Sequence, residues 1–334
     1  MNVVARCVVM VFALVPFAAG AESIKLKFAF FASDREYAYR AVVKPFADAV
    51  SLEGKGIVEI ELFAGGTLGR TYAEHAQLVL DGTVDFAWIN PSLTPELFPD
   101  NPVIELPGLF RDAGEATRVH TRLVALDALR GYSEFVVIAA IGTGPFAIHM
   151  RPQIGSLEQL KGKKIRTGGS TEGAVLKELG LLPQVMPVNR TVEAINRGAI
   201  EGASVPPATL VDFGISRFTR YHYLLDLGSA PLLIVMNRKK FDSLPKAGQD
   251  LIRKYSGEWA ATRYIQTTEA YENLIVKQLQ SDPERTVIYP SGSDLDAAHL
   301  AFKTVTEAWT GQNPHNRELL KLVHGEIAKL RSDR

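Results

Sequence analysis

The chain has 334 residues, of which 46% are hydrophobic, and its 37 basic and 37 acidic side chains give a formal net charge of zero. Nucleic-acid binding requires clustered cations, so this balance and the lack of a basic block argue against a nucleic-acid partner. A chain of this length buries a sizeable core without disulfides and usually divides into two domains.

The first 21 residues have the features of an export signal. Arg6 supplies a positive charge, residues 8–18 form an apolar run too short to span a bilayer, and Ala19-Gly20-Ala21 matches an A-x-A cleavage site. An uncleaved membrane anchor is the alternative, which Pro16 and the small residues at the cleavage site disfavour. We therefore expect a periplasmic protein, and Cys7, the single cysteine, would leave with the signal.

Short strands then alternate with helices, which is the pattern of an α/β domain. Four phenylalanines at strand or helix spacing are predicted to belong to the core: Phe30, Phe31, Phe46 and Phe110. Residues 142–145 (GTGP) predict a crossover out of this domain. The predicted strands are 24–32, 57–63, 85–89, 135–141 and 146–150, and the predicted helices are 34–49, 71–80 and 113–129.

A second α/β set follows the crossover. Residues 231–237 (PLLIVMN) are strongly apolar, as expected for a buried central strand. Residues 246–279 continue one helical pattern, with at most one break near Ser256-Gly257, and this length suits an element that bridges two lobes. The other predicted strands are 164–166, 184–187, 200–205 and 286–289, and the helices are 156–162, 171–179, 192–197 and two after residue 289.

Motifs for catalysis or metal binding are not found. The sequence has no H-E-x-x-H, no Cys/His cluster and no Walker motif, and residues 168–172 resemble a nucleophile elbow without its closing glycine. We expect neither cofactor nor metal, and the enzyme interpretation is disfavoured. A secreted enzyme acting on small acids, with a site assembled from distant residues, stays open.

The sharpest chemical feature surrounds Arg166. This residue ends a predicted strand, which is where open α/β sheets place their ligands. Gly168 and Gly169 permit close backbone approach, and Ser170 or Thr171 would cap a helix whose N-terminus lies nearby. A guanidinium in this setting suits a carboxylate, whereas a surface arginine in a basic strand is the alternative.

Four segments, in this order, carry a family pattern: 62–69 (LFAGGTLG), 77–87 (QLVLDGTVDFA), 160–166 (LKGKKIR) and 193–202 (EAINRGAIEG). Together they resemble the DctP-type substrate-binding subunits of TRAP (tripartite ATP-independent periplasmic) transporters, over essentially the whole mature chain. The resemblance implies an α/β, two-lobed periplasmic binding protein fold with a hinge and a long helix that spans both lobes. It also implies that Arg166 binds a ligand carboxylate as the lobes close.

The resemblance also predicts the domain ranges and the partner. After a signal peptide at 1–21, lobe I would comprise 22–145 plus 229–265, and lobe II 146–228 plus 266–334. The partner would be a TRAP-type membrane permease, and the receptor a monomer or homodimer. A sensory protein that docks on a membrane receptor remains an alternative.

Three positions depart from family members that bind sugar acids. Gly144 or its neighbours replace a second arginine, Val205 replaces an asparagine, and the region of Arg190 replaces an acidic residue. These changes remove polar groups, and an unpartnered buried polar group is costly, so pocket polarity should match that of the ligand. We therefore predict a small organic monocarboxylate with a fairly apolar body.

Other candidate contacts follow the predicted strands. Trp88 would stack on the ligand or belong to the core, and Asn90 occupies the position where sugar-acid binders carry a carboxylate. His149 would hydrogen-bond a keto or hydroxyl group of the ligand, or it is a packed core histidine. Further candidates are Ser33 and Tyr37, which either reach the cleft or cap and cover the first helix, and Asn189 and Val205, which would line the second lobe.

Overall fold

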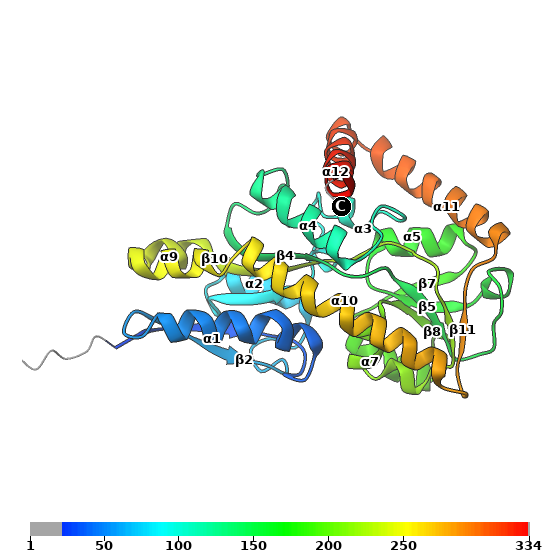
Figure 1. Cartoon of the computed structure of the whole chain (residues 1–334), viewed down its shortest axis with the longest axis horizontal. Coiled ribbons are helices and arrows are strands. Elements are labelled where there is room, and N and C mark those ends of the chain that lie inside the picture. The colour runs from blue at the N-terminus through cyan, green and yellow to red at the C-terminus, as the bar shows by residue number, and fades with distance from the viewer. Residues whose placement is uncertain (1–21, 333–334) are drawn as a thin grey trace, which may run out of the picture.

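The computed structural model describes residues 22–332, so the predicted export signal lies outside the described residues. These residues form two lobes, each built on a mixed β-sheet that is covered by helices (Figure 1). The α/β two-lobed fold predicted from the sequence is confirmed.

The sheet of lobe I has the strand order β2-β1-β3-β10-β4. β1 pairs in parallel with both β2 and β3, whereas β10 is antiparallel to both of its neighbours. Residues 233–236 of β10 are fully buried, as the apolar run predicts for an interior strand. The strands are β1 (Ile24–Ala29), β2 (Val58–Phe63), β3 (Phe86–Ile89), β4 (Phe135–Gly142) and β10 (Pro231–Asn237).

The sheet of lobe II has the order β11-β9-β5-β8-β6-β7. One of its interior strands, β9, was not predicted, because the three residues of Tyr221–Tyr223 are too few to show a period. The other strands are β5 (Ala147–Met150), β6 (Lys164–Thr167), β7 (Leu182–Val185), β8 (Gly202–Val205) and β11 (Thr286–Ile288).

Two extended segments and one long helix are among the connections between the lobes. The segments between β4 and β5 and between β9 and β10 are hydrogen-bonded to each other, from Thr143 N to Ala230 O (3.0 Å) and from Phe146 N to Gly228 O (2.9 Å). Helix α10 (Glu258–Ser281) runs along both lobes (Figure 1). It follows α9 (Lys246–Lys254) after a break at Gly257, which confirms the predicted long helical element with one interruption.

Helices cover both sheets and bury the hydrophobic core, which includes the four predicted phenylalanines. Around lobe I lie α1 (Lys44–Glu53), α2 (Tyr72–Leu80), α3 (Pro102–Glu105), α4 (Ala113–Ala125) and α8 (Arg238–Ser243). Around lobe II lie α5 (Ser170–Glu178), α6 (Thr191–Asn196), α7 (Pro207–Asp212) and α11 (Gly292–Gly311).

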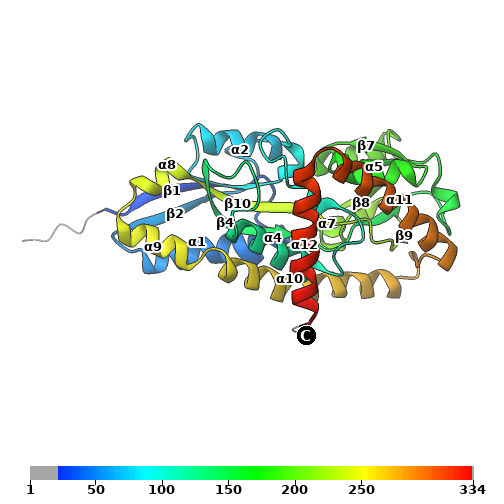
Figure 2. The ribbon, with the colours of Figure 1, turned by 90° about the horizontal axis from the view of Figure 1, so that it is seen from above.

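The last helix, α12 (Pro314–Ser332), lies across the middle of the molecule (Figure 2). Its apolar residues Leu319 and Val323 share a core cluster with residues of the lobe I sheet. Arg331 donates to both carboxylate oxygens of Glu115 in α4, at 3.0 and 2.8 Å. The predicted assignment of the whole range 266–334 to lobe II therefore does not describe this helix.

Some predicted elements have different boundaries. β1 ends at Ala29 rather than residue 32, and the first helix begins with a π-helical turn at Tyr39–Val43. α4 ends at Ala125 rather than residue 129, shortly before Asp127, which has a positive φ of 52° that a helix cannot contain. The helix predicted at 156–162 is a single 3₁₀ turn, Glu158–Leu160.

Candidate functional site: a cavity between the lobes

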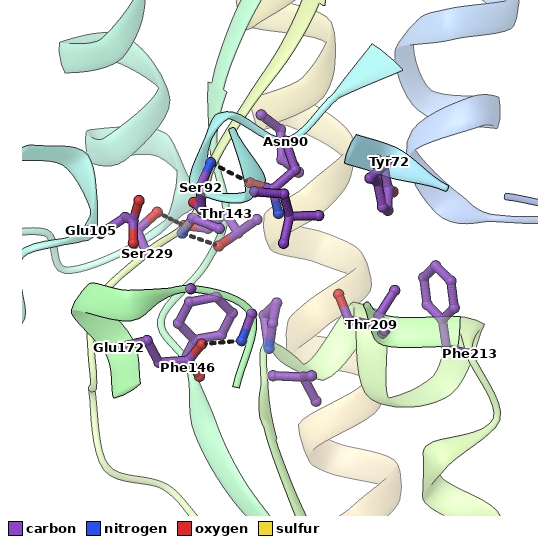
Figure 3. Close-up of a pocket in the computed structure, with 18 of the residues that line it drawn as sticks. Tyr72, Asn90, Ser92, Glu105, Thr143, Phe146, Glu172, Thr209, Phe213 and Ser229 are labelled. Carbon is purple, nitrogen blue, oxygen red and sulfur yellow. Dashed lines mark hydrogen bonds between the residues drawn. The ribbon is translucent and has the colours of Figure 1, made fainter. Parts of the chain in front are cut away.

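A cavity lies between the lobes, at the carboxyl ends of β3, β6 and β8 (Figure 3). The space between its wall atoms, open mouth included, is about 730 Å³. Its apolar wall consists of Trp88, Leu93, Phe146, Val188, Val205, Pro206, Phe213, Ala230 and Leu232. Its polar wall includes Glu36, Tyr72, Asn90, Ser92, Glu105, Thr143, Arg166, Glu172, Thr209 and Ser229.

Arg166 lines this cavity from the end of β6, and only 6% of its surface is exposed. Its Nε donates to the carbonyl oxygen of Met186 (3.1 Å), and its Nη1 donates to that of Ser204 (3.4 Å). Within residues 22–332 the guanidinium forms no salt bridge, and Nη2 donates to no acceptor. Because a guanidinium carries five N–H donors, Arg166 is fixed in place with donors left for a ligand.

Glu172 in α5 supports the backbone beside this arginine. Its Oε2 accepts hydrogen bonds from the amide of Gly168 (2.7 Å) and the hydroxyl of Thr167 (2.5 Å). The cap of α5 is Gly169, rather than Ser170 or Thr171 as predicted, and the Glu172 carboxylate reaches back over this first turn. Burial raises the pKa of Glu172, while the charge of Arg166 opposes this rise.

Gly168 is in close contact with the Arg166 side chain. A Cβ atom built on Gly168 would lie 3.2 Å from Nη2 of Arg166, closer than most real Cβ contacts, and 3.5 Å from Nη1, an ordinary van der Waals distance. The glycine at this position therefore lets the guanidinium lie against the backbone.

Two more carboxyl groups face the cavity from lobe I. Burial raises the pKa of Glu105 to about 7, and Glu172 adds to this rise from across the interface. Burial and the nearby Asp212 raise the pKa of Glu36 to about 8. Arg166 is thus the one basic side chain among the described residues that line the cavity.

Trp88 and Asn90 come from β3 and the turn that follows it. Trp88 is 1% exposed and contacts Phe30 edge to face, with 5.8 Å between the ring centroids. It therefore belongs both to the core and to the cavity wall. The Oδ1 of Asn90 accepts a hydrogen bond from Ser92 N (3.0 Å) and caps a short 3₁₀ turn, Pro91–Leu93. Val205 contributes an apolar side chain from β8.

Four predicted contacts lie elsewhere. Ser33 and Asn189 line a separate depression, which adjoins the cavity at Glu36 and Phe213. Tyr37 stacks on Tyr271 of α10, with 4.6 Å between the ring centroids. The backbone amide of Tyr37 donates a hydrogen bond to the carboxylate of Asp212 in lobe II (3.0 Å). It therefore contributes to the contact between the lobes rather than to the cavity wall.

The fourth, His149, is fully buried beneath the cavity. Its Nε2 lies 3.1 Å from the Val205 carbonyl oxygen, and its Nδ1 lies 2.9 Å from Nδ1 of His222. With Nε2–H donating to the carbonyl, Nδ1 is left to accept a hydrogen bond from His222. Burial lowers the pKa of His149 to about 4, and burial together with nearby positive charges also lowers the pKa of His222, so both rings are neutral near neutral pH.

Several wall residues were not predicted from the sequence. Tyr72, Phe146 and Glu105 lie far apart in the chain, and no local pattern links them. Glu172 had a weaker signal, because an acidic residue is favoured in the first turn of a helix.

Residues 22–332 contain neither a cluster of potential metal ligands nor a helix suited to spanning a membrane. No three or more His, Cys, Asp or Glu side chains there are grouped as metal ligands. None of the helices in this range combines the length and apolarity required to cross a bilayer.

Comparison with known proteins places this cavity in context. A family model described as bacterial extracellular solute-binding protein, family 7 (DctP), matches residues 28–312. A marine metagenome TRAP solute-binding protein specific for aromatic acid ligands, from an unidentified microbe, was solved with metahydroxyphenylacetate. It is 25% identical with a TM-score of 0.85, over 92% of this chain and 99% of that one.

Two other relatives are similar. A TRAP solute-binding protein from Rhodoferax ferrireducens T118, solved with copurified benzoate, is 25% identical with a TM-score of 0.83, over 92% of this chain and 98% of that one. The 2,3-diketo-L-gulonate-binding periplasmic protein YiaO of Escherichia coli K12 is 27% identical over 214 residues, or 63% of this chain and 65% of that one. All three names describe binding of a small organic acid.

Proposed function

Since this chain belongs to family 7 of the bacterial extracellular solute-binding proteins, the DctP family, we propose that it is the receptor of a TRAP-type transporter for small monocarboxylates with an aromatic or otherwise apolar body. The receptor would work in the periplasm after removal of residues 1–21. It would bind its ligand between the lobes and deliver it, unchanged, to membrane permease subunits.

The observation that carries this proposal is the buried, incompletely bonded guanidinium of Arg166 in an otherwise acidic and apolar cavity. Burial weakens competition from water, so the remaining donors would bind a carboxylate through charge-assisted hydrogen bonds. Trp88, Phe146, Phe213 and Leu232 would contact the body of the ligand. Aromatic acids are also the ligands of the marine metagenome and Rhodoferax ferrireducens relatives.

Isothermal titration calorimetry with benzoate tests the role of Arg166. We expect Arg166→Lys to weaken binding roughly 10- to 150-fold, because an ammonium cannot replace the planar fork and a hydrogen bond to a charged group contributes about 1.5–3 kcal/mol. Arg166→Ala should abolish measurable binding.

Arg151→Lys is the matched control, because Arg151 is an exposed arginine in the same lobe and does not line the cavity. It should bind benzoate as the wild-type protein does. If Arg166→Lys and Arg151→Lys bound equally well, the carboxylate would not lie on Arg166. Ligand recovered unchanged after prolonged incubation, by mass spectrometry, would distinguish a receptor from an enzyme.

A further inference from the structure

Glu105 is a buried carboxyl group without a cationic partner. It is the last residue of α3, between Pro102 and Pro107, and only 6% of its surface is exposed. In Figure 3 it faces the cavity from the lobe I side, across from Glu172. Among residues 22–332 no lysine or arginine forms an ion pair with it, and its nearest polar partners are the hydroxyl groups of Ser92 and Thr171.

Glu115, another buried glutamate of this lobe, shows what a structural carboxylate looks like here. It is paired with Arg331 through two hydrogen bonds. Burying a carboxyl group without such a partner costs free energy, which the hydroxyl groups of Ser92 and Thr171 offset only in part. Its position in the cavity wall offers another account, in which the missing partner belongs to the ligand.

The local backbone leaves space at this carboxyl group. A Cβ atom on Gly169 would lie 3.0 Å from Oε2 of Glu105, so any larger residue would press on the carboxyl oxygen. The preceding residue, Gly168, contacts the guanidinium of Arg166. Glu105 and Arg166 thus lie beside consecutive residues, so the body of a small ligand whose carboxylate is on Arg166 would be within reach of Glu105.

We propose that Glu105 determines specificity by bonding a hydroxyl group on the body of the ligand, so that hydroxylated monocarboxylates are preferred to unsubstituted ones. This inference rests on the proposed function, in which Arg166 binds the carboxylate.

A hydroxyl group fits this carboxyl group better than an ammonium does. Since burial raises the pKa of Glu105 to about 7, both the neutral and the ionised forms occur near neutral pH. A hydroxyl group donates to the ionised form and accepts from the neutral form, whereas an ammonium only donates. The hydroxyl group of Ser92 lies beside Glu105 and also lines the cavity, so it offers the ligand hydroxyl a second hydrogen-bonding partner.

Calorimetric affinities for benzoate and for 2-, 3- and 4-hydroxybenzoate test the inference. In the wild-type protein, at least one hydroxylated isomer should bind tenfold or more tightly than benzoate, since an unsatisfied buried polar group costs about 1–3 kcal/mol. In Glu105→Met, which keeps the length of the side chain and removes its polar atoms, this ratio should fall to about one. Glu105→Gln should retain part of the preference.

Glu96→Met is the matched control, because Glu96 is exposed and does not line the cavity. It should keep the wild-type ratio. If the wild-type protein bound benzoate through Arg166 but preferred no hydroxylated isomer, the role of Glu105 would be refuted and the proposed function would stand. A preference that persists in Glu105→Met would do the same. Failure of all four acids to bind would overturn the proposed function together with it.

Discussion

The variant Gly168→Ala tests how strongly ligand binding by the Arg166 guanidinium depends on the backbone of residue 168. The new Cβ would lie 3.2 Å from Nη2 and 3.6 Å from Cζ of Arg166, so the guanidinium would have to move by several tenths of an ångström. A displacement of that size costs at most one charge-assisted hydrogen bond to the ligand, about 1.5–3 kcal/mol. The expected loss of affinity is therefore roughly tenfold, with an upper limit of about 150-fold.

The assay is calorimetric titration of benzoate, with urea unfolding of the ligand-free protein alongside. Stability should change little, because the backbone of Gly168 does not have the positive φ that disfavours alanine. Gly311→Ala is the control, since Gly311 is exposed at the end of α11 and a Cβ there meets nothing within 4 Å. Unchanged affinity in Gly168→Ala would refute the contact between this residue and the binding arginine.

Two further predictions concern stability, measured by urea unfolding without ligand. Because burial raises the pKa of Glu105 from 4.5 to about 7, the unfolded chain loses this proton at a lower pH than the folded protein does, so the folded state becomes less stable as pH rises from 4.5 to 7. Glu105→Gln should therefore match the wild-type free energy of unfolding near pH 4 and exceed it by up to about 3 kcal/mol near pH 8; a difference independent of pH would contradict this. Gly257→Ala should lose at least about 1 kcal/mol, because φ 59° and ψ −119° strain any side chain, whereas Gly325→Ala in α12 should not.

The sequence predicted the fold well wherever local periodicity decides the structure. The interior strand β10 and the interrupted helices α9 and α10 were found because their apolar patterns are long. The strand β9 and the four-residue helix α3 were missed, since each is too short to show a period. Their positions depend on pairing and packing with distant parts of the chain.

The candidate site was predictable only in part. Arg166 was found because it ends a strand in a family motif, and Trp88, Asn90, Gly168 and Val205 also line the cavity. Whether each of these touches a ligand stays a prediction. Glu105 was not found, because what distinguishes it is burial without a cation, and burial arises from the approach of two lobes rather than from neighbouring residues.

The helix pair at the end of the chain has a mechanical consequence. α11 packs on α5 of lobe II, and α12 packs on α4 of lobe I, so the elbow between them at Gln312-Asn313 spans the outside of the molecule. Together with α10 and the two bonded crossing segments, it ties the halves at separate points. Because attachments spread in this way oppose twisting and sliding, we expect the lobes to move by bending about one axis. Trp309 is buried at the elbow, so we expect its fluorescence to report that bending.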